Sequence, residues 1–398
     1  MKLTLKNRLL RWARERAGMD EETLARKIFG KHAADPERVK EWERTGEVTY
    51  SRAEKIAEKT HTPFGFLFLD EPPEEKLPIQ DFRTVGTTHL KRPSPDLLDV
   101  IYECQRRQAW FREYLVKNGK APLEWLGKHT VQTPIETTAH AIRTRIKIGA
   151  GLSTTIHSWR DNLTTHFEAA EESGILVMRN GVVGNNGSRA LDVAEFRGFA
   201  LYDEYAPLVF INTRDAKAAQ LFTLVHEIAH IFLGVSALSN TLRTYSDGAA
   251  IETYCNQVAA EVLVPKEALI QRWRAVYNDD PFLKIRRLAG EFKVSTLVLA
   301  RRSKDAGFIT NKDFEAFYED EIVAYLKIDR PKKAEGEESS GNFHNTLRAR
   351  AGSRFCNALI ANTLAGTTAY TQAFRLLGIK GTDAFHNFAK AKFAHLMR

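Results

Sequence analysis

Two histidines and a glutamate lie inside an otherwise apolar stretch of the chain, "LFTLVHEIAHIF", at residues 221–232. The apolar residues around them predict a buried helix over about 215–234. On this helix His226 and His230 are four residues apart, so their imidazoles lie one above the other on the same face. Two neutral imidazoles at this spacing can bind one Zn²⁺, and Glu227 can take a proton from a water that the metal activates. The stretch therefore predicts a zinc site with a general base beside it.

A third metal ligand is required, and the next apolar helix offers one. The sequence "IETYCNQVAAEVLVP" places Glu252 twenty-two positions after His230. A glutamate from a second helix completes the His₂Glu ligand set of thermolysin-type enzymes. Asn256, one turn further on, is expected to hydrogen-bond a ligand histidine and fix its tautomer. Glu261 is the alternative third ligand, although it lies deeper in the helix.

The composition limits the class of protein. A chain of 398 residues is too long for a single core, so two or three domains are expected. The three cysteines lie far apart with no C-x-x-C pair, which excludes a disulfide scaffold and a cysteine-based zinc knuckle. The N-terminus carries charges where a signal peptide needs an apolar stretch. The most apolar window, 218–238, carries the two histidines and the glutamate, which are costly in lipid, so we expect a cytoplasmic protein with no membrane partner.

The formal net charge of +8 is distributed unevenly. Residues 1–75 hold about fifteen basic and fifteen acidic side chains and are close to neutral. Residues 341–398 hold eight basic residues and a single acid, Asp383, which gives this tail a net charge of about +7. The basic tail is therefore a candidate surface for nucleic acid or an acidic partner protein, and a solvated face is the alternative.

Residues 1–70 are predicted to form short helices with tight connections. Asp20 is expected to cap the second helix, and Asp35 and Pro36 to start the third, which ends at Gly46. Helix, turn, helix and a supporting helical pair is the helix-turn-helix plan. The segments "ARERAGMDEETLARKI" and "VKEWERTGEVTYSRAEKIAEKTHTPFGFLF" resemble the Xre/Cro repressor family. This plan favours DNA binding, whereas the balanced charge favours docking to a protein.

The remaining chain is predicted to contain one large domain between two linkers. Proline and acidic residues mark a linker at 71–90, and a charged polar run without large apolar residues marks another at 329–342. Between them, at 91–328, three long helical patterns precede strand signals at "GILVMRNGVV" and "FRGFALYDEYAPLVFIN", with a hairpin turn at 204–207. Residues 343–398 form a basic helical module. The predicted fold class is α+β, mostly helical, with a small antiparallel sheet in the large domain.

The strand hairpin, "HEIAH" and "ETYCNQVAAEVLVP" together resemble the ImmA/IrrE family of zinc metallopeptidases over about 174–326. The resemblance implies a zincin-like fold with His226, His230 and Glu252 as zinc ligands and Glu227 as the general base. It also implies a narrow task, the cleavage of a helix-turn-helix repressor to relieve repression. "LPIQDFRT" and the basic tail look like members in which a repressor-type domain precedes the peptidase. Cys255 departs from the family, which more often has alanine there, and should pack as a small apolar residue.

Two classes of function follow from these patterns. The first is a zinc endopeptidase that cleaves a repressor or similar regulatory protein. The second is a DNA- or protein-binding transcriptional regulator, or an antitoxin-like protein, whose zinc site is structural or vestigial. Glu227 favours the first class, because a structural zinc needs no base beside its ligand. Tyr245, Arg243 and Tyr254 are candidate oxyanion partners, among which the sequence does not select.

Overall fold

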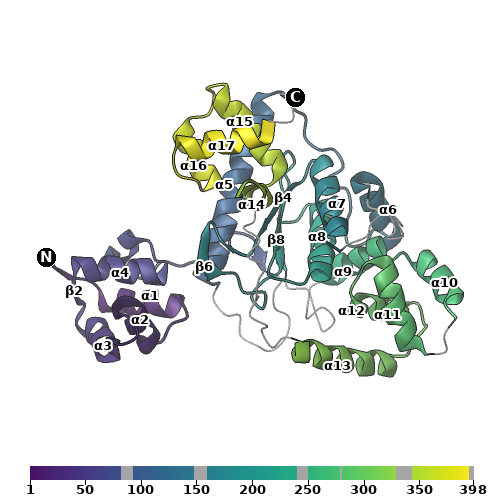
Figure 1. Cartoon of the computed structure of the whole chain (residues 1–398), viewed down its shortest axis with the longest axis horizontal. Helices are drawn as coiled ribbons and strands as arrows, with labels where there is room; N and C mark the ends of the chain where they lie inside the picture. The colour runs from purple at the N-terminus through teal and green to yellow at the C-terminus, as the bar shows by residue number, and fades with distance from the viewer. Residues whose placement is uncertain (82–92, 148–158, 240–249, 278–279, 329–342, 394–398) are drawn as a thin grey trace. The chain divides into compact units, whose positions relative to one another are not determined.

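The structure is a computed structural model that describes residues 1–81, 93–147, 159–239, 250–277, 280–328 and 343–393 (Figure 1). Helices make up most of these residues and the strands form small sheets, which confirms the mostly helical α+β class. The chain divides into two compact units, one built mainly on Met1–Pro78 and the other on Glu103–Arg398. The five-part domain division stays a prediction, since 82–90 of the first predicted linker and all of 329–342 lie outside the described residues.

The N-terminal unit packs its helices around one apolar core, and local signals set their ends. Asp20 accepts a hydrogen bond from the Thr23 backbone N–H at 2.7 Å, and Asp35 accepts one from the Glu37 N–H at 3.2 Å, as predicted. Gly46 ends the third helix with a left-handed φ of 75°. The elements are β1 (Lys2–Thr4), α1 (Asn7–Arg16), α2 (Glu21–Phe29), α3 (Pro36–Thr45), β2 (Glu47–Thr49), α4 (Tyr50–Thr60) and the 3₁₀ helix η1 (Phe64–Phe68).

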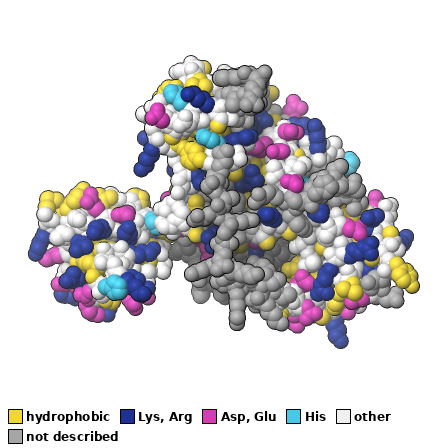
Figure 2. All heavy atoms as spheres, viewed as in Figure 1, with side chains coloured by type: hydrophobic (Ala, Val, Ile, Leu, Met, Phe, Trp, Pro, Cys, Tyr) yellow, Lys and Arg dark blue, Asp and Glu magenta, His cyan; other side chains and the backbone are white. Residues whose placement is uncertain are grey.

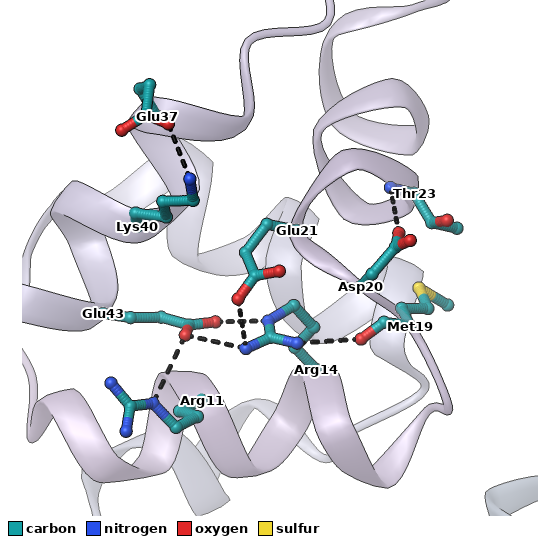
Figure 3. A network of polar contacts seen from close by, with 9 residues as sticks. All are labelled: Arg11, Arg14, Met19, Asp20, Glu21, Thr23, Glu37, Lys40 and Glu43. Carbon is teal, nitrogen blue, oxygen red and sulfur yellow. Dashed lines mark hydrogen bonds and ion pairs between the residues drawn. The ribbon is translucent and has the colours of Figure 1, made fainter.

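A buried ion pair joins α1 to α3 in this unit (Figure 3). The Arg14 guanidinium donates two hydrogen bonds to the Glu43 carboxylate, at 2.6 and 2.9 Å, and a third to the Met19 carbonyl at 2.9 Å. Glu21 lies 2.9 Å from the same guanidinium, and Arg11 lies 3.5 Å from Glu43. Each charged group in this cluster therefore lies next to a group of opposite charge. The Glu43 carboxylate is occupied by these internal contacts.

Two exposed basic side chains of α3 also pair with nearby acidic side chains. Lys40 lies 2.6 Å from Glu37, and Arg38 lies 3.4 Å from Asp35. Basic and acidic side chains alternate over the face of the N-terminal unit in Figure 2. The near-neutral net charge expected from the sequence is therefore accompanied by local pairing of basic with acidic side chains.

The second unit contains a five-stranded sheet with the order β3-β9-β7-β8-β4. Strands β7 and β8 pair antiparallel with Gly198 opposite Ile211, which confirms the hairpin predicted with its turn at 204–207. The sheet is mixed, however, and the expectation of an antiparallel sheet was wrong in this detail, because β4 pairs parallel with β8 and β3 pairs parallel with β9. Strands β5, β6 and β7 lie between β4 and β8 in the chain, so a long connection rather than a tight hairpin joins β4 to β8, as parallel pairing requires. The strands are β3 (Gln80–Asp81), β4 (Leu176–Asn180), β5 (Val182–Val183), β6 (Asn186–Ala190), β7 (Gly198–Leu201), β8 (Leu208–Asn212) and β9 (Ala237–Ser239).

Helices flank the sheet, with α7 and α8 on one side and α14 on the other (Figure 1). Helix α8 is buried along almost its whole length and ends at Gly234, which has a φ of 75°. Among the helices that the structure describes, none is long and apolar enough to cross a membrane. The helices of this part are α5 (Pro95–Lys117), α6 (Ile135–Ile146), α7 (Trp159–Glu172), α8 (Lys217–Leu233), α9 (Ala250–Leu263), α10 (Lys266–Ala275), α11 (Pro281–Phe292), α12 (Thr296–Asp305) and α13 (Asn311–Ile328).

The C-terminal helices pack onto β4 and α5. The buried Arg107 guanidinium of α5 donates to the Leu376 carbonyl at 2.8 Å, to the Arg350 carbonyl at 3.3 Å and to the Glu103 carboxylate. Phe355 meets Trp110 of α5 edge-on at 5.5 Å between ring centroids. Three of the tail's basic side chains, those of Arg348, Arg350 and Arg354, are only partly exposed. These helices are α14 (Phe343–Ala351), α15 (Ser353–Leu364), α16 (Tyr370–Leu377) and α17 (Thr382–Phe393).

Candidate metal centre

Helices α8 and α9 bring the three predicted metal ligands together. The Nε2 atoms of His226 and His230 lie 3.1 Å apart. The Glu252 carboxylate reaches both, with Oε2 3.3 Å from His226 Nε2 and Oε1 2.9 Å from His230 Nε2. All three side chains are buried, and their donor atoms lie within 4.8 Å of one another. Two imidazoles from one helix and a carboxylate from the next thus converge on a single point.

The environment favours the protonation states that bind a metal. Burial lowers the pKa of His230 and so favours its neutral imidazole. Burial alone would raise the pKa of Glu252, but the adjacent imidazoles of His226 and His230 outweigh it and hold the pKa of this carboxyl well below its usual range. A neutral imidazole and an ionised carboxylate are the forms that ligate a divalent cation.

The donor set fits zinc in chemistry and in spacing. Two nitrogens and one oxygen, with room for a fourth ligand, are typical of a catalytic zinc site. Ligand atoms about 2.05 Å from a tetrahedral zinc are separated from one another by roughly 3.3 Å. The two Nε2 atoms, 3.1 Å apart, lie close to this separation, and the two carboxylate oxygens of Glu252 lie 3.3 and 2.9 Å from the Nε2 atoms of His226 and His230, respectively. The residues present therefore fit the ion, and His226, His230 and Glu252 are the residues that would hold it.

Glu227 lies beside this group against strand β7. A methyl group added at Gly198 would lie 3.4 Å from the Glu227 Cγ and 2.6 Å from the Thr223 Cγ2. The same position is 2.8 Å from the Phe210 carbonyl oxygen of β8, so any residue larger than glycine would clash both with α8 and with the neighbouring strand. The close approach of β7 to α8 at Gly198 thus sets where the Glu227 side chain lies.

Two expectations about neighbouring residues are not met among the described residues. Asn256 is buried, but its amide makes no hydrogen bond to a described residue, so the predicted bond to a ligand histidine is absent. The Tyr254 hydroxyl donates to the Thr133 carbonyl at 2.8 Å and lies 2.7 Å from the Thr138 hydroxyl. Tyr254 is thus engaged with the α6 region and is not placed as an oxyanion partner. The other two candidates, Tyr245 and Arg243, lie outside the described residues.

Glu261, the alternative third ligand, lies away from the metal centre. Its carboxylate forms an ion pair with Arg302 of α12 and accepts a hydrogen bond from the Lys266 backbone N–H at 3.3 Å. Cys255 packs in the core beside the ligands, and burial raises the pKa of its thiol well above the usual range. The thiol therefore stays protonated, as expected of a small apolar residue. The geometry favours Glu252 over Glu261, and the assignment of metal ligands stays a prediction.

Sequence reasoning missed Gly198 and Thr223, which shape the surroundings of Glu227. A lone glycine inside the apolar strand pattern "FRGFAL" was the available signal, because such a glycine often marks a close approach of another backbone. Thr223 offered no comparable signal, since a threonine within a helix usually bonds to its own backbone.

Comparison with protein families supports this interpretation for part of the chain. Residues 170–304 match the family model described as IrrE N-terminal-like domain, Peptidase_M78. The match contains α8 and α9, and it supports the ImmA/IrrE resemblance and a metallopeptidase-type domain here. Residues 351–391 match a domain of unknown function, DUF8813, which covers most of the C-terminal helices. No curated protein matches the chain. The Xre/Cro resemblance of residues 1–70 stays a prediction.

Proposed function

We propose that this chain is a zinc-dependent endopeptidase. The observation that carries the proposal is the convergence of His226, His230 and Glu252 on one buried point, with Glu227 beside them in the sequence. The family match over residues 170–304 supports the same activity. A structural zinc site needs a closed ligand set, whereas the described residues supply three candidate ligands and, in Glu227, a carboxylate that is not a member of the group.

The residues of the site divide the work of peptide hydrolysis. A zinc ion, when bound, supplies Lewis acidity for the scissile carbonyl and brings the pKa of a water towards neutrality. Glu227 accepts a proton from that water on a carboxylate oxygen, and the water oxygen forms the new bond to the carbonyl carbon. The carboxyl then delivers the proton to the amide nitrogen as the C–N bond breaks. Burial keeps competing water away from the Glu227 carboxylate.

We further propose that the substrate is a helix-turn-helix repressor or a similar regulatory protein. The ImmA/IrrE resemblance supports this assignment, because it implies cleavage of a repressor. The N-terminal unit and the C-terminal helices are candidate docking parts for such a protein. For the N-terminal unit, the locally paired charges of α3 favour docking to a protein over binding to DNA.

The substitution Glu227→Gln tests the proposed activity. Glutamine keeps the shape of the side chain and removes the base, so the variant should retain its zinc and its fold. Cleavage of the regulatory substrate should fall by at least about a hundredfold, the usual contribution of a general base. The assay is co-expression with the products of neighbouring genes, followed by measurement of cleavage rates and zinc content. An unimpaired variant with zinc in place would contradict the enzyme and favour a regulator with a structural metal.

A further inference from the structure

Thr223 differs from four other threonines inside the described helices. The hydroxyls of Thr60 and Thr363, which are equally buried, donate to the carbonyls four residues earlier, each at 2.7 Å. Thr45 and Thr165 make the same bond at 2.9 Å from exposed positions. The Thr223 hydroxyl is buried as well, but it makes no hydrogen bond within the described part of the chain. A buried hydroxyl without a partner costs about 1–3 kcal/mol, and valine would fill the same space without this cost.

Thr223 lies beside the proposed general base. It precedes Glu227 by four residues on α8, so the two side chains lie on the same face of the helix. The Thr223 Cγ2 and the Glu227 Cγ lie 2.6 and 3.4 Å from the same point above Gly198. The methyl group of Thr223 therefore packs against β7, and its hydroxyl is available for a hydrogen bond near the candidate metal centre.

We propose that Thr223 is a positioning residue for Glu227. In the metal-loaded site its hydroxyl donates a hydrogen bond to the Glu227 carboxylate and holds it in line with the water that it deprotonates. A bond from a neutral hydroxyl to a charged carboxylate is one of the stronger hydrogen bonds available to a threonine. Catalytic hydrogen bonds often form only in the loaded site and are long or absent before it. This inference rests on the proposed function, because it assumes Glu227 is the base.

A double-mutant cycle, measured by denaturant unfolding of the variants, tests the contact between Thr223 and Glu227 without an activity assay. The cycle compares Thr223→Val in the native background with Thr223→Val in a Glu227→Leu background, in protein as purified with its zinc content measured. Valine removes the donor in the first background, whereas in the second it removes a hydroxyl that has lost its acceptor. Thr223→Val should therefore change the denaturant midpoint more favourably, towards higher stability, in the Glu227→Leu background than in the native background. Equal shifts in both backgrounds would overturn the proposal, whether or not the protein is a peptidase.

Turnover by the zinc-loaded protein gives the second test. Thr223→Val should lower kcat about ten- to hundredfold with KM unchanged, because the substrate still binds but the base is misplaced. Thr223→Ser, which keeps the hydroxyl and loses the methyl group, should retain kcat within about threefold while lowering thermal stability. Thr363→Val is the matched control, since it removes an equally buried hydroxyl far from the site in sequence. Loss of kcat in the serine variant equal to that in the valine variant would assign Thr223 a packing role instead.

Discussion

The N-terminal unit and the metal centre each bury a cluster of charged or titratable side chains, but the two clusters are built differently. In the first, the guanidinium of Arg14 meets the carboxylates of Glu43 and Glu21, so donors and acceptors match within the cluster. In the second, two imidazoles and one carboxylate, all groups that can ligate a metal, converge within 4.8 Å of one another. When the imidazoles are neutral, they can donate hydrogen bonds to the Glu252 carboxylate but carry no charge opposite to its own.

This difference separates a structural cluster from a ligand site. Burying an ion pair is tolerable when each charge meets its opposite and the remaining hydrogen bonds are made. Burying three convergent metal-ligating groups with one net negative charge gains little until a cation joins them. The first cluster therefore explains how α3 is held on α1, and the second is the proposed metal site. The predictions below test these two roles.

The largest expected effect is on the N-terminal cluster. Glu43→Leu leaves the Arg14 guanidinium buried without its bidentate partner, which should lower the free energy of unfolding by about 3–5 kcal/mol. Denaturant unfolding followed by circular dichroism measures the loss. The double variant Arg14→Met with Glu43→Leu should recover most of it, because the charges that lose a partner, those of Glu21 and Arg11, are exposed to solvent in part. A single variant as stable as the native protein would show that this cluster is not structural.

A smaller effect is expected where the C-terminal helices meet α5. Arg107→Met removes the donor that the Leu376 and Arg350 carbonyls share, which should cost about 1.5–3 kcal/mol. Residues 343–393 should then be cleaved faster in limited proteolysis. Arg375→Met, at an exposed basic residue of the same helices, is the control and should leave the rate unchanged. Equal cleavage of the two variants would show that Arg107 does not hold these helices.

The smallest expected effect concerns Glu171 of α7, which accepts a hydrogen bond from the Arg354 backbone N–H at 3.3 Å. Burial raises the pKa of this carboxyl, so the folded protein holds the proton more tightly than the unfolded chain does. The ionised carboxylate then costs stability above the raised pKa, and the cost disappears below the ordinary glutamate pKa. Glu171→Gln should therefore be slightly more stable than the native protein at pH 7, by less than about 1 kcal/mol, with the difference vanishing towards pH 4. A difference that grows on acidification would contradict this.

The parts of the fold that the sequence predicted depend on local signals. The caps at Asp20 and Asp35, the end of α8 at Gly234 and the β7–β8 hairpin each follow from a few neighbouring residues. The convergence of His226, His230 and Glu252 could also be predicted, since His226 and His230 share a helix face and Glu252 begins the next apolar helix.

The features that the sequence did not reveal depend on residues far apart in the chain. The three-residue strands β1 and β2 pair across more than forty positions, which no periodic pattern marks. The parallel pairing of β4 with β8 and the docking of Arg107 onto α14 and α16 are likewise tertiary contacts. Asn256 is a further example. Its position one turn after Glu252 predicted a hydrogen bond to a ligand histidine, and the structure does not contain this bond among the described residues.

The metal content of the purified protein tests the central claim most directly. Elemental analysis should find close to one zinc per chain in the native protein and in Glu261→Ala, whose carboxylate pairs with Arg302. It should find far less in His226→Ala and Glu252→Ala, because each loses one of three ligands. Full zinc occupancy in Glu252→Ala, with loss in Glu261→Ala, would contradict the ligand set. A native protein that binds no zinc would contradict the metal centre itself.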